Sequence, residues 1–219
     1  MRRVAFVAVL CAFVAAPAFA DMAVNVQTSV TGRWGTTRGG DFLMTVLPTT
    51  MGGDPIGIYG VGSSFTTFCV ETDEFVSDND YYVTVRSDAW QGGTAGPEPD
   101  PLSPQSAYLY SLWLDSGIAH NTTNANDIQQ AIWWLEQETG WGVDNYLVAQ
   151  ANTAVAVGGS WYNTWGADSI GDIRVMNLWT NVDHTGNAQD MLVRVPLPAA
   201  VLLGMLGLGA AGLKLRRFA

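Results

Sequence analysis

Residues 103–140 read SPQSAYLYSLWLDSGIAHNTTNANDIQQAIWWLEQETG, and they decide the fold because their helical pattern interrupts a chain of strand-like segments. Ser103 followed by Pro104 is typical of a helix N-cap and the first helical position. An apolar face then runs to Gly117, where the pattern ends. The sequence therefore predicts a helix that starts at Pro104 and ends near Gly117.

Two further helices follow from the same signals. Asp127 is the predicted N-cap of a helix over residues 128–139, and Asp144 is the predicted N-cap of a helix over residues 145–157. Both segments run into glycine, which favours a helix end. The sequence thus predicts a lobe of three helices.

Short segments rich in β-branched and aromatic residues lie before and after this lobe, separated by Gly, Asp and Pro clusters. The Pro- and Gly-rich residues 91–101 predict a loop. The expected fold class is α+β, an antiparallel β-sandwich or barrel with an inserted three-helix lobe. The predicted strands are residues 30–36, 42–47, 64–71, 81–86, 172–179 and 190–195.

The N-terminal residues 1–20 have the three parts of a secretory signal peptide. Arg2 and Arg3 form a charged start, residues 4–16 form an apolar run, and Ala18-Phe19-Ala20 forms an A-x-A cleavage site. We therefore expect the chain to be exported and cleaved after Ala20.

The middle of the chain, residues 21–195, is long enough for one domain with its own core. It holds all 20 acidic residues but only five arginines, which gives a formal charge of −15. This balance excludes a nucleic-acid-binding protein, because binding phosphate requires clustered Lys and Arg. A disulfide scaffold is excluded as well, because Cys69 is the only cysteine after the signal peptide.

The C-terminal residues 196–219 have the layout of a membrane-directed tail. An apolar stretch follows a short Pro-rich motif and ends in basic residues, which hold that end of a span in the cytoplasm. This order resembles the PEP-CTERM family of sorting signals in its VPLPA form, although Pro-Leu-Pro stands where that family has Pro-Glu-Pro. The resemblance implies a transient inner-membrane anchor that an exosortase removes, in a Gram-negative bacterium that makes exopolysaccharide. The motif consists of Val195, Pro196, Leu197, Pro198 and Ala199.

Two short motifs in the middle domain carry the chemistry. Phe68-Cys69-Val70 is an aromatic-Cys-aliphatic triplet in a predicted strand, and residues 128–133 read IQQAIW at the start of a predicted helix. Together and in this order they resemble the motifs of the bacterial thioester domains. The resemblance implies that the side chains of Cys69 and Gln129 condense, with loss of ammonia, into an internal thioester.

The expected position of Gln129 supports this interpretation on physical grounds. After an Asp127 cap, Gln129 would be the second helical residue, where unpaired N–H groups could stabilise an oxyanion. Trp133 lies one turn further on the same face, where it could shield the bond from water. The same helix end would lower the pKa of Cys69, whether or not a thioester forms. A buried, inert Cys69 and a solvated Gln129 remain the simple alternative.

Other site chemistries have weaker support. A cysteine hydrolase needs a His beside the nucleophile, but His120 and His184 lie in Asn- and Thr-rich segments, where we expect exposed loops. Acidic clusters could bind Ca²⁺, but none matches a calcium-binding loop, so we expect a solvated acidic surface. These clusters are Glu71, Asp73 and Glu74, and Asp78 and Asp80.

Tryptophan supports an alternative function. Aromatic faces suit sugar rings, and Trp161 and Trp165 lie in Gly-, Asn- and Ser-rich surroundings. Trp113, Trp133 and Trp179 are better explained as core residues. The protein could therefore be a non-covalent exopolysaccharide-binding or structural matrix protein without a thioester. The tryptophans are Trp34, Trp90, Trp113, Trp133, Trp134, Trp141, Trp161, Trp165 and Trp179.

The sequence as a whole predicts a cell-surface or extracellular-matrix protein that attaches covalently to a partner for adhesion or crosslinking. The expected partners are the exosortase and a surface target or exopolysaccharide that bears an amine or hydroxyl. The only lysine, Lys214, lies in the tail, so the domain has no amine side chain that could react with its own thioester. We expect no enzyme turnover, no cofactor, no metal and no nucleic acid.

Overall fold

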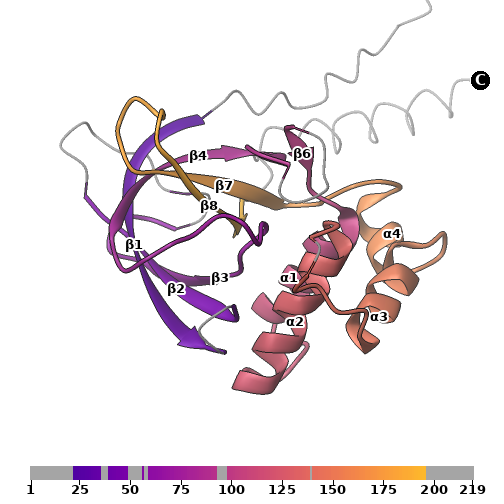
Figure 1. Ribbon diagram of the computed structural model, residues 1–219. Coiled ribbons are helices and arrows are strands. Elements are labelled where there is room, and N and C mark those ends of the chain that lie inside the picture. Colours follow the sequence, from indigo (N-terminus) through magenta and orange to yellow (C-terminus); the bar gives the residue numbers. More distant parts are fainter. Residues whose placement is uncertain are drawn as a thin grey trace, which may run out of the picture. The chain divides into compact units, whose positions relative to one another are not determined.

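Among the described residues of the computed structural model, six strands form one antiparallel sheet (Figure 1). The structure describes residues 22–35, 39–48, 56, 59–92, 98–138 and 140–195, with backbone alone for residues 22–34. The order across the sheet is β3-β2-β1-β4-β7-β8. Its strands are β1 (Met22–Trp34), β2 (Asp41–Val46), β3 (Ser64–Thr67), β4 (Asp80–Arg86), β7 (Ile173–Trp179) and β8 (Asn187–Arg194). Each overlaps a predicted strand, and β5 (Asp88–Ala89) and β6 (Asp100–Pro101) form a separate short ladder.

The sheet curls until the segment after one edge strand meets the other edge strand. The backbone N–H of Val70 donates to the carbonyl oxygen of Asp190 at 2.8 Å, and Leu192 N–H donates to the carbonyl of Phe68 at 3.1 Å. Cys69 therefore lies opposite Met191 in an antiparallel bridge. The continuation of β3 thus bonds to β8 and brings the two edges together.

The helices are inserted between β6 and β7 and gather beside the sheet (Figure 1). The predicted start of the first helix is confirmed, since Pro104 opens it and the Ser103 side chain accepts a hydrogen bond from Ser106 N–H. The mixed α+β class and the insertion of helices into a β domain are confirmed as well. The helices are α1 (Pro104–Leu114), α2 (Thr122–Leu135), α3 (Tyr146–Val155) and the short α4 (Ser160–Trp165), which was not predicted.

The predicted starts of the second and third helices are wrong. Helix α2 begins at Thr122, where the Asn121 side chain accepts a hydrogen bond from Asn124 N–H at 2.9 Å. Asp127 therefore lies inside α2 and is not its cap. The first turn of α2 is mostly polar, but Ala125 in that turn is fully buried, so packing stabilises the helix there. Similarly, the N-cap of α3 is Asn145 and not the predicted Asp144, because the Asn145 side chain accepts a hydrogen bond from Leu147 N–H.

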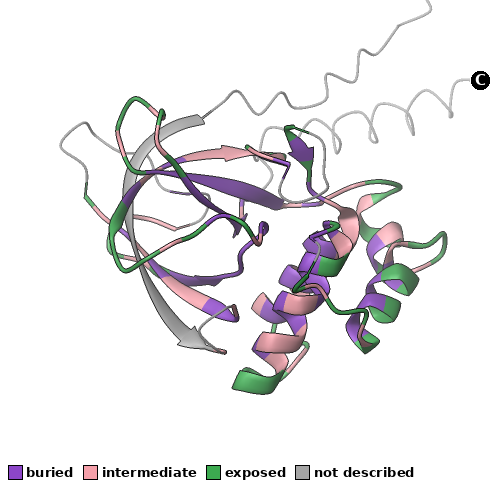
Figure 2. Ribbon diagram, viewed as in Figure 1, coloured by how far each residue is buried: buried purple, intermediate pink, exposed green. Residues whose placement is uncertain are grey.

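Strand β7 separates two hydrophobic cores, because its side chains alternate between the two faces of the sheet. Ile173 and Val175 pack with the buried faces of the helices, whereas Met176 and Leu178 pack in the core enclosed by the curled sheet. All seven residues of β7 are buried for this reason (Figure 2). Burial on both faces of a strand anchors the helical lobe to the sheet.

The signal peptide predicted at residues 1–20 and the sorting tail predicted at residues 196–219 lie outside the described residues. In the part of the chain that the structure describes, none of the helices has the length and apolar character needed to cross a membrane.

Candidate functional site

The side chain of Gln129 pairs with the backbone of Cys69 through two hydrogen bonds. Cys69 N–H donates to Gln129 Oε1 at 3.0 Å, and Gln129 Nε2 donates to the Cys69 carbonyl at 2.8 Å. Both residues are almost fully buried, with exposed fractions of 4% for Cys69 and 1% for Gln129. The structure therefore brings together the two residues that the motifs single out. Gln130, by contrast, is half-buried.

The geometry of the sheet edge explains why Gln129 can make this contact. In the antiparallel bridge, the hydrogen bonds to β8 come from Phe68 and Val70, on either side of Cys69. The N–H and C=O of Cys69 consequently point away from β8. Buried backbone groups need partners, and the carboxamide of Gln129 supplies a donor and an acceptor at the correct spacing.

Trp133 and Gly39 close around the Gln129 side chain. Trp133 lies one helical turn after Gln129, is 6% exposed, and belongs to the same core as Cys69. A Cβ atom on Gly39 would come within 2.7 Å of Gln129 Cγ and 2.8 Å of Trp133 Cη2. The close approach of Gly39 therefore helps to exclude water from the contact, and only glycine fits there.

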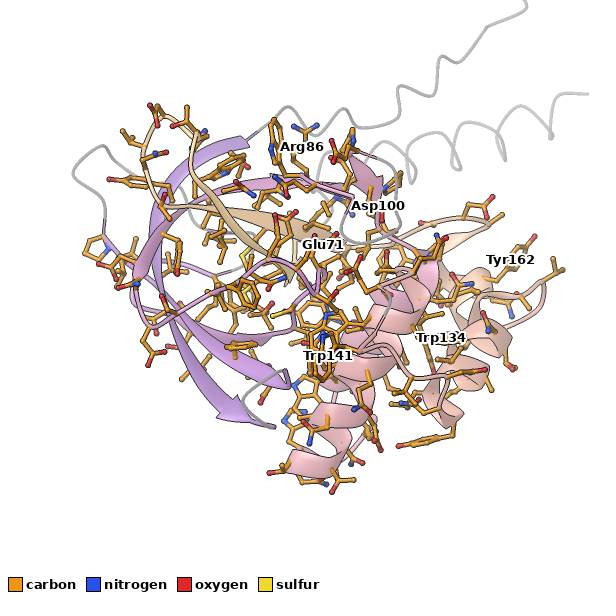
Figure 3. All side chains as sticks on the ribbon, viewed as in Figure 1. Glu71, Arg86, Asp100, Trp134, Trp141 and Tyr162 are labelled. Carbon is orange, nitrogen blue, oxygen red and sulfur yellow. The ribbon has the colours of Figure 1, made fainter. Side chains whose placement is uncertain are left out.

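A cavity of about 450 Å³ adjoins the contact. Cys69 and Trp133 line it, together with Glu71 and the exposed aromatic residues Phe75 and Trp141. Figure 3 shows Glu71 and Trp141 between the sheet and the helices. A small group from solvent could reach the neighbourhood of Cys69 through this space.

Two sequence-based expectations about the site are wrong. Gln129 is the eighth residue of α2 and not the second, so the free N–H groups of a helix start do not surround it. In addition, the pKa of the Cys69 thiol is raised and not lowered, first because the side chain is buried and then because the charge of Glu74 is nearby. Cys69 is therefore a neutral, largely buried thiol at the edge of the cavity.

Acidic side chains that were expected to be solvated are buried beside Cys69. Glu71 and Glu74 are 1% and 8% exposed, although Asp78 and Asp80 are exposed as predicted. Burial, and next the charge of Glu138, raise the pKa of Glu71 to about 10. Glu74 differs from Glu71 because its carboxylate accepts hydrogen bonds from the Asn187 side chain and the Asp190 backbone.

Neither histidine belongs to the site. His120 is exposed, as predicted, and its ring stacks on Trp113 at a centroid distance of 4.1 Å. His184 is half-buried and lies 5.6 Å from the ring of Trp179. The described lining of the cavity contains no histidine, so a Cys-His pair is absent there.

The set of buried tryptophans differs in part from the one that the sequence predicts. The three predicted core residues, Trp113, Trp133 and Trp179, are buried. Trp161, however, is also buried, because its indole N–H donates to the Ser169 carbonyl in a packed turn. Trp165 is half-buried in α4. The exposed members are Trp90, Trp134 and Trp141, and the side chain of Trp34 lies outside the described residues.

Sequence reasoning missed two residues that shape the site. Gly39 lies far from both motifs along the chain, and Glu138 looks like a surface residue near a helix end, although it is only 2% exposed. No family model, no curated protein and no solved structure matches this chain.

Proposed function

We propose that this protein is an exported surface or matrix protein that uses a Cys69–Gln129 thioester to attach covalently to a nucleophilic partner. The observation that supports this most is the double hydrogen bond that holds the Gln129 carboxamide against Cys69 in a buried site. Such positioning fixes the carboxamide against the backbone of the residue that carries the thiol, which reduces the entropy cost of bringing the two side chains together.

Thioester formation needs no co-reactant. The Cys69 sulfur attacks Cδ of Gln129, the Sγ–Cδ bond forms, and the Cδ–Nε2 bond breaks. The thiol proton leaves with Nε2 as ammonia, so one ammonia is lost for each bond formed. The Cys69 N–H, at 3.0 Å from Oε1, is the donor placed to stabilise the negative charge on that oxygen during the attack.

The buried environment suits a bond that must survive until a partner arrives. Trp133 and Gly39 exclude water from one side of Gln129, which slows hydrolysis. The cavity beside Cys69 then gives a partner nucleophile its route to the carbonyl.

The charge and composition of the domain favour an amine from another molecule. Residues 21–195 contain no lysine, so the domain cannot consume its own thioester through a lysine side chain. The formal charge of −15 attracts lysine-rich surfaces at long range. Acyl transfer then forms an amide, restores the Cys69 thiol, and happens once for each molecule. The protein is therefore an adhesin or crosslinker and not an enzyme.

The two ends of the chain supply the route to the cell surface. The signal peptide directs export, and the tail with Val195-Pro196-Leu197-Pro198-Ala199 directs removal by an exosortase-type enzyme. The domain is then retained at the cell surface or in the extracellular matrix after a transient stay at the inner membrane. An exopolysaccharide hydroxyl is the alternative acceptor in that setting.

Capture of an amine tests the function directly. The full chain is incubated with methylamine, and peptides are analysed by mass spectrometry. We expect a methylamide on Gln129, with Gln130 unmodified, and parallel incubation with matrix polysaccharide tests hydroxyl acceptors. Adducts with hydroxyls alone would contradict an amine target, and no adduct with either would contradict covalent attachment.

A non-covalent glycan-binding function is the second candidate. Phe75 is 81% exposed and Trp141 is 45% exposed, and both line the cavity. Aromatic faces at a cavity suit sugar rings. Binding of matrix polysaccharide that survives Cys69→Ala but is lost in Phe75→Ala and Trp141→Ala would favour this second function.

A further inference from the structure

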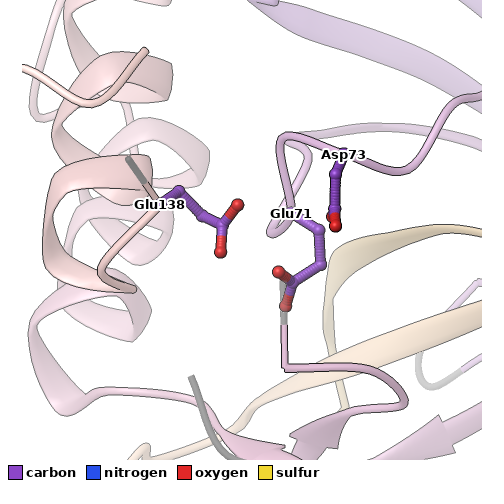
Figure 4. A group of neighbouring side chains, drawn as sticks. All are labelled: Glu71, Asp73 and Glu138. Atoms are coloured by element: carbon purple, nitrogen blue, oxygen red, sulfur yellow. The ribbon is translucent and has the colours of Figure 1, made fainter. Parts of the chain in front are cut away.

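Three carboxylates from two parts of the chain converge next to the cavity. Glu71 and Asp73 belong to the segment that follows β3, and Glu138 lies just after α2. One oxygen from each can be chosen so that all three lie within 4.8 Å of one another. Figure 4 shows the three side chains directed toward the same small space.

The buried state of Glu71 is the independent sign that this cluster has a ligand. Glu71 is 1% exposed and lines the cavity, and among the described residues no N–H or hydroxyl donates to its side-chain oxygens, which face the carboxylate of Glu138. A buried carboxylate without partners is strongly unfavourable unless a cation or a proton compensates it. Two carboxyl groups that face each other in a buried site are stabilised either by a shared proton or by a cation between them, and the third carboxylate, Asp73, favours the cation.

Glu138 is held in place for such a role. Its Oε2 accepts hydrogen bonds from Thr72 N–H at 2.9 Å and from Thr72 Oγ1 at 2.5 Å. Thr72 lies between the other two acidic residues, so these bonds fix Glu138 to the segment that carries Glu71 and Asp73. The positions of the three carboxylates therefore depend on one local arrangement.

We propose that Glu71, Asp73 and Glu138 bind a calcium ion. Carboxylate oxygens are the preferred ligands of Ca²⁺ at about 2.3–2.6 Å, so oxygens that lie within 4.8 Å of one another can all contact one ion. Ca²⁺ is favoured over Mg²⁺ because three carboxylates exceed the one or two that Mg²⁺ usually takes, and Ca²⁺ accepts irregular geometry. Water completes the coordination on the cavity side.

The ion would join the two segments that form the candidate site. Glu71 lies two residues after Cys69, and Glu138 lies beyond the end of the helix that carries Gln129. Calcium would therefore hold the strand segment and the helix together. This inference rests on the carboxylates themselves and does not require the proposed thioester, because neither Cys69 nor Gln129 contributes a ligand.

Calcium binding by the full chain tests the proposal. The chain is treated with EDTA, desalted and titrated with CaCl2, while thermal unfolding and calorimetry are followed. We expect Ca²⁺ to raise the unfolding temperature, with a Kd of roughly 10⁻⁴ to 10⁻³ M, the range of extracellular calcium modules. Terbium gives a second measurement, because Trp133 and Trp141 line the same cavity as Glu71 and would sensitise its luminescence.

Matched variants separate this site from the general acidity of the surface. Asp73→Asn and Glu138→Gln should weaken Ca²⁺ binding at least tenfold, whereas Asp78→Asn, a change of another exposed aspartate in the same segment, should leave it unchanged. Cys69→Ala should also bind Ca²⁺ normally. If Glu138→Gln fails to fold, the exposed Asp73→Asn decides the question. No response of the wild-type chain, or an equal response in Asp73→Asn and wild type, would overturn the proposal.

Discussion

Cys69 and Glu71 are separated by one residue, yet their polar groups have opposite surroundings. The backbone N–H and C=O of Cys69 are both paired with Gln129, whereas the side-chain oxygens of Glu71 receive no hydrogen bond from an N–H or hydroxyl of the described residues and face the Glu138 carboxylate. Both residues are buried. A paired contact is complete in itself and can serve the fold or a reaction, whereas two buried carboxyl groups that face each other need a shared proton or a bound cation.

Removal of the Gln129 side chain should have the largest effect. In a Cys69→Ala background, where the Gln129 amide stays intact, Gln129→Ala leaves the N–H and C=O of residue 69 buried without partners, at about 1–3 kcal/mol each, so we expect a loss of about 4 kcal/mol in the free energy of unfolding. Urea unfolding measures this loss. Gln130→Ala is the matched control, since this half-buried neighbour should change stability by less than about 1 kcal/mol. Equal effects of the two substitutions would show that the contact with Cys69 is not important.

Glu136 provides an intermediate case, a buried carboxylate that does have donors. It accepts hydrogen bonds from the Ser103 hydroxyl and backbone N–H, but burial, together with the charge of Asp100, raises its pKa to about 7. The unfolded chain releases this proton near the ordinary value of 4.5, so the contribution of Glu136 to stability is full below pH 4.5 and is lost as the pH rises to 7.

Glu136→Gln should remove this pH dependence. The amide oxygen can still accept from Ser103 but carries no charge, so above pH 7 the variant should be more stable than wild type by about 3 kcal/mol, from 1.36 kcal/mol per pKa unit. Chemical unfolding at pH 4 and at pH 8 gives the two values. Asp144→Asn, at an exposed position, is the control and should follow wild type. A constant difference between Glu136→Gln and wild type at both pH values would contradict this explanation.

A smaller effect on stability is expected at Gly39, which packs against the side chains of Gln129 and Trp133. Gly39 has a φ of +155°, and a Cβ would overlap Gln129 and Trp133. Gly39→Ala should therefore reduce stability by about 2 kcal/mol, as is typical of overpacking, and change Trp fluorescence. Calcium binding should persist in this variant. Unchanged stability and fluorescence would mean that residue 39 does not contact the site closely.

The sequence predicted the parts of the fold that local patterns determine. The strands alternate or carry β-branched runs, and Ser103-Pro104 marks the start of α1. The start of α2 was missed because residues 122–126 are mostly polar, and the burial of Ala125 that stabilises them depends on tertiary packing.

The candidate site was predictable only in part. Cys69 and Gln129 were paired through their resemblance to motifs, and they are in contact in the structure. The burial of Glu71 and Glu138 was not predictable, because carboxylates are ordinarily found at the surface and only the closure of the sheet against the helices removes them from water. The neutral state of the Cys69 thiol follows from the same closure.

The intact mass of the purified protein shows whether the thioester forms. We expect a wild-type mass that is one ammonia below the value for the sequence, with the deficit absent in Cys69→Ala and Gln129→Ala and present in Gln130→Ala. Cys69→Ala should keep the fold, because Gln129 bonds to backbone atoms of residue 69. A wild-type mass equal to that of the plain sequence, with a Cys69 thiol that alkylates once the protein is unfolded, would contradict the thioester.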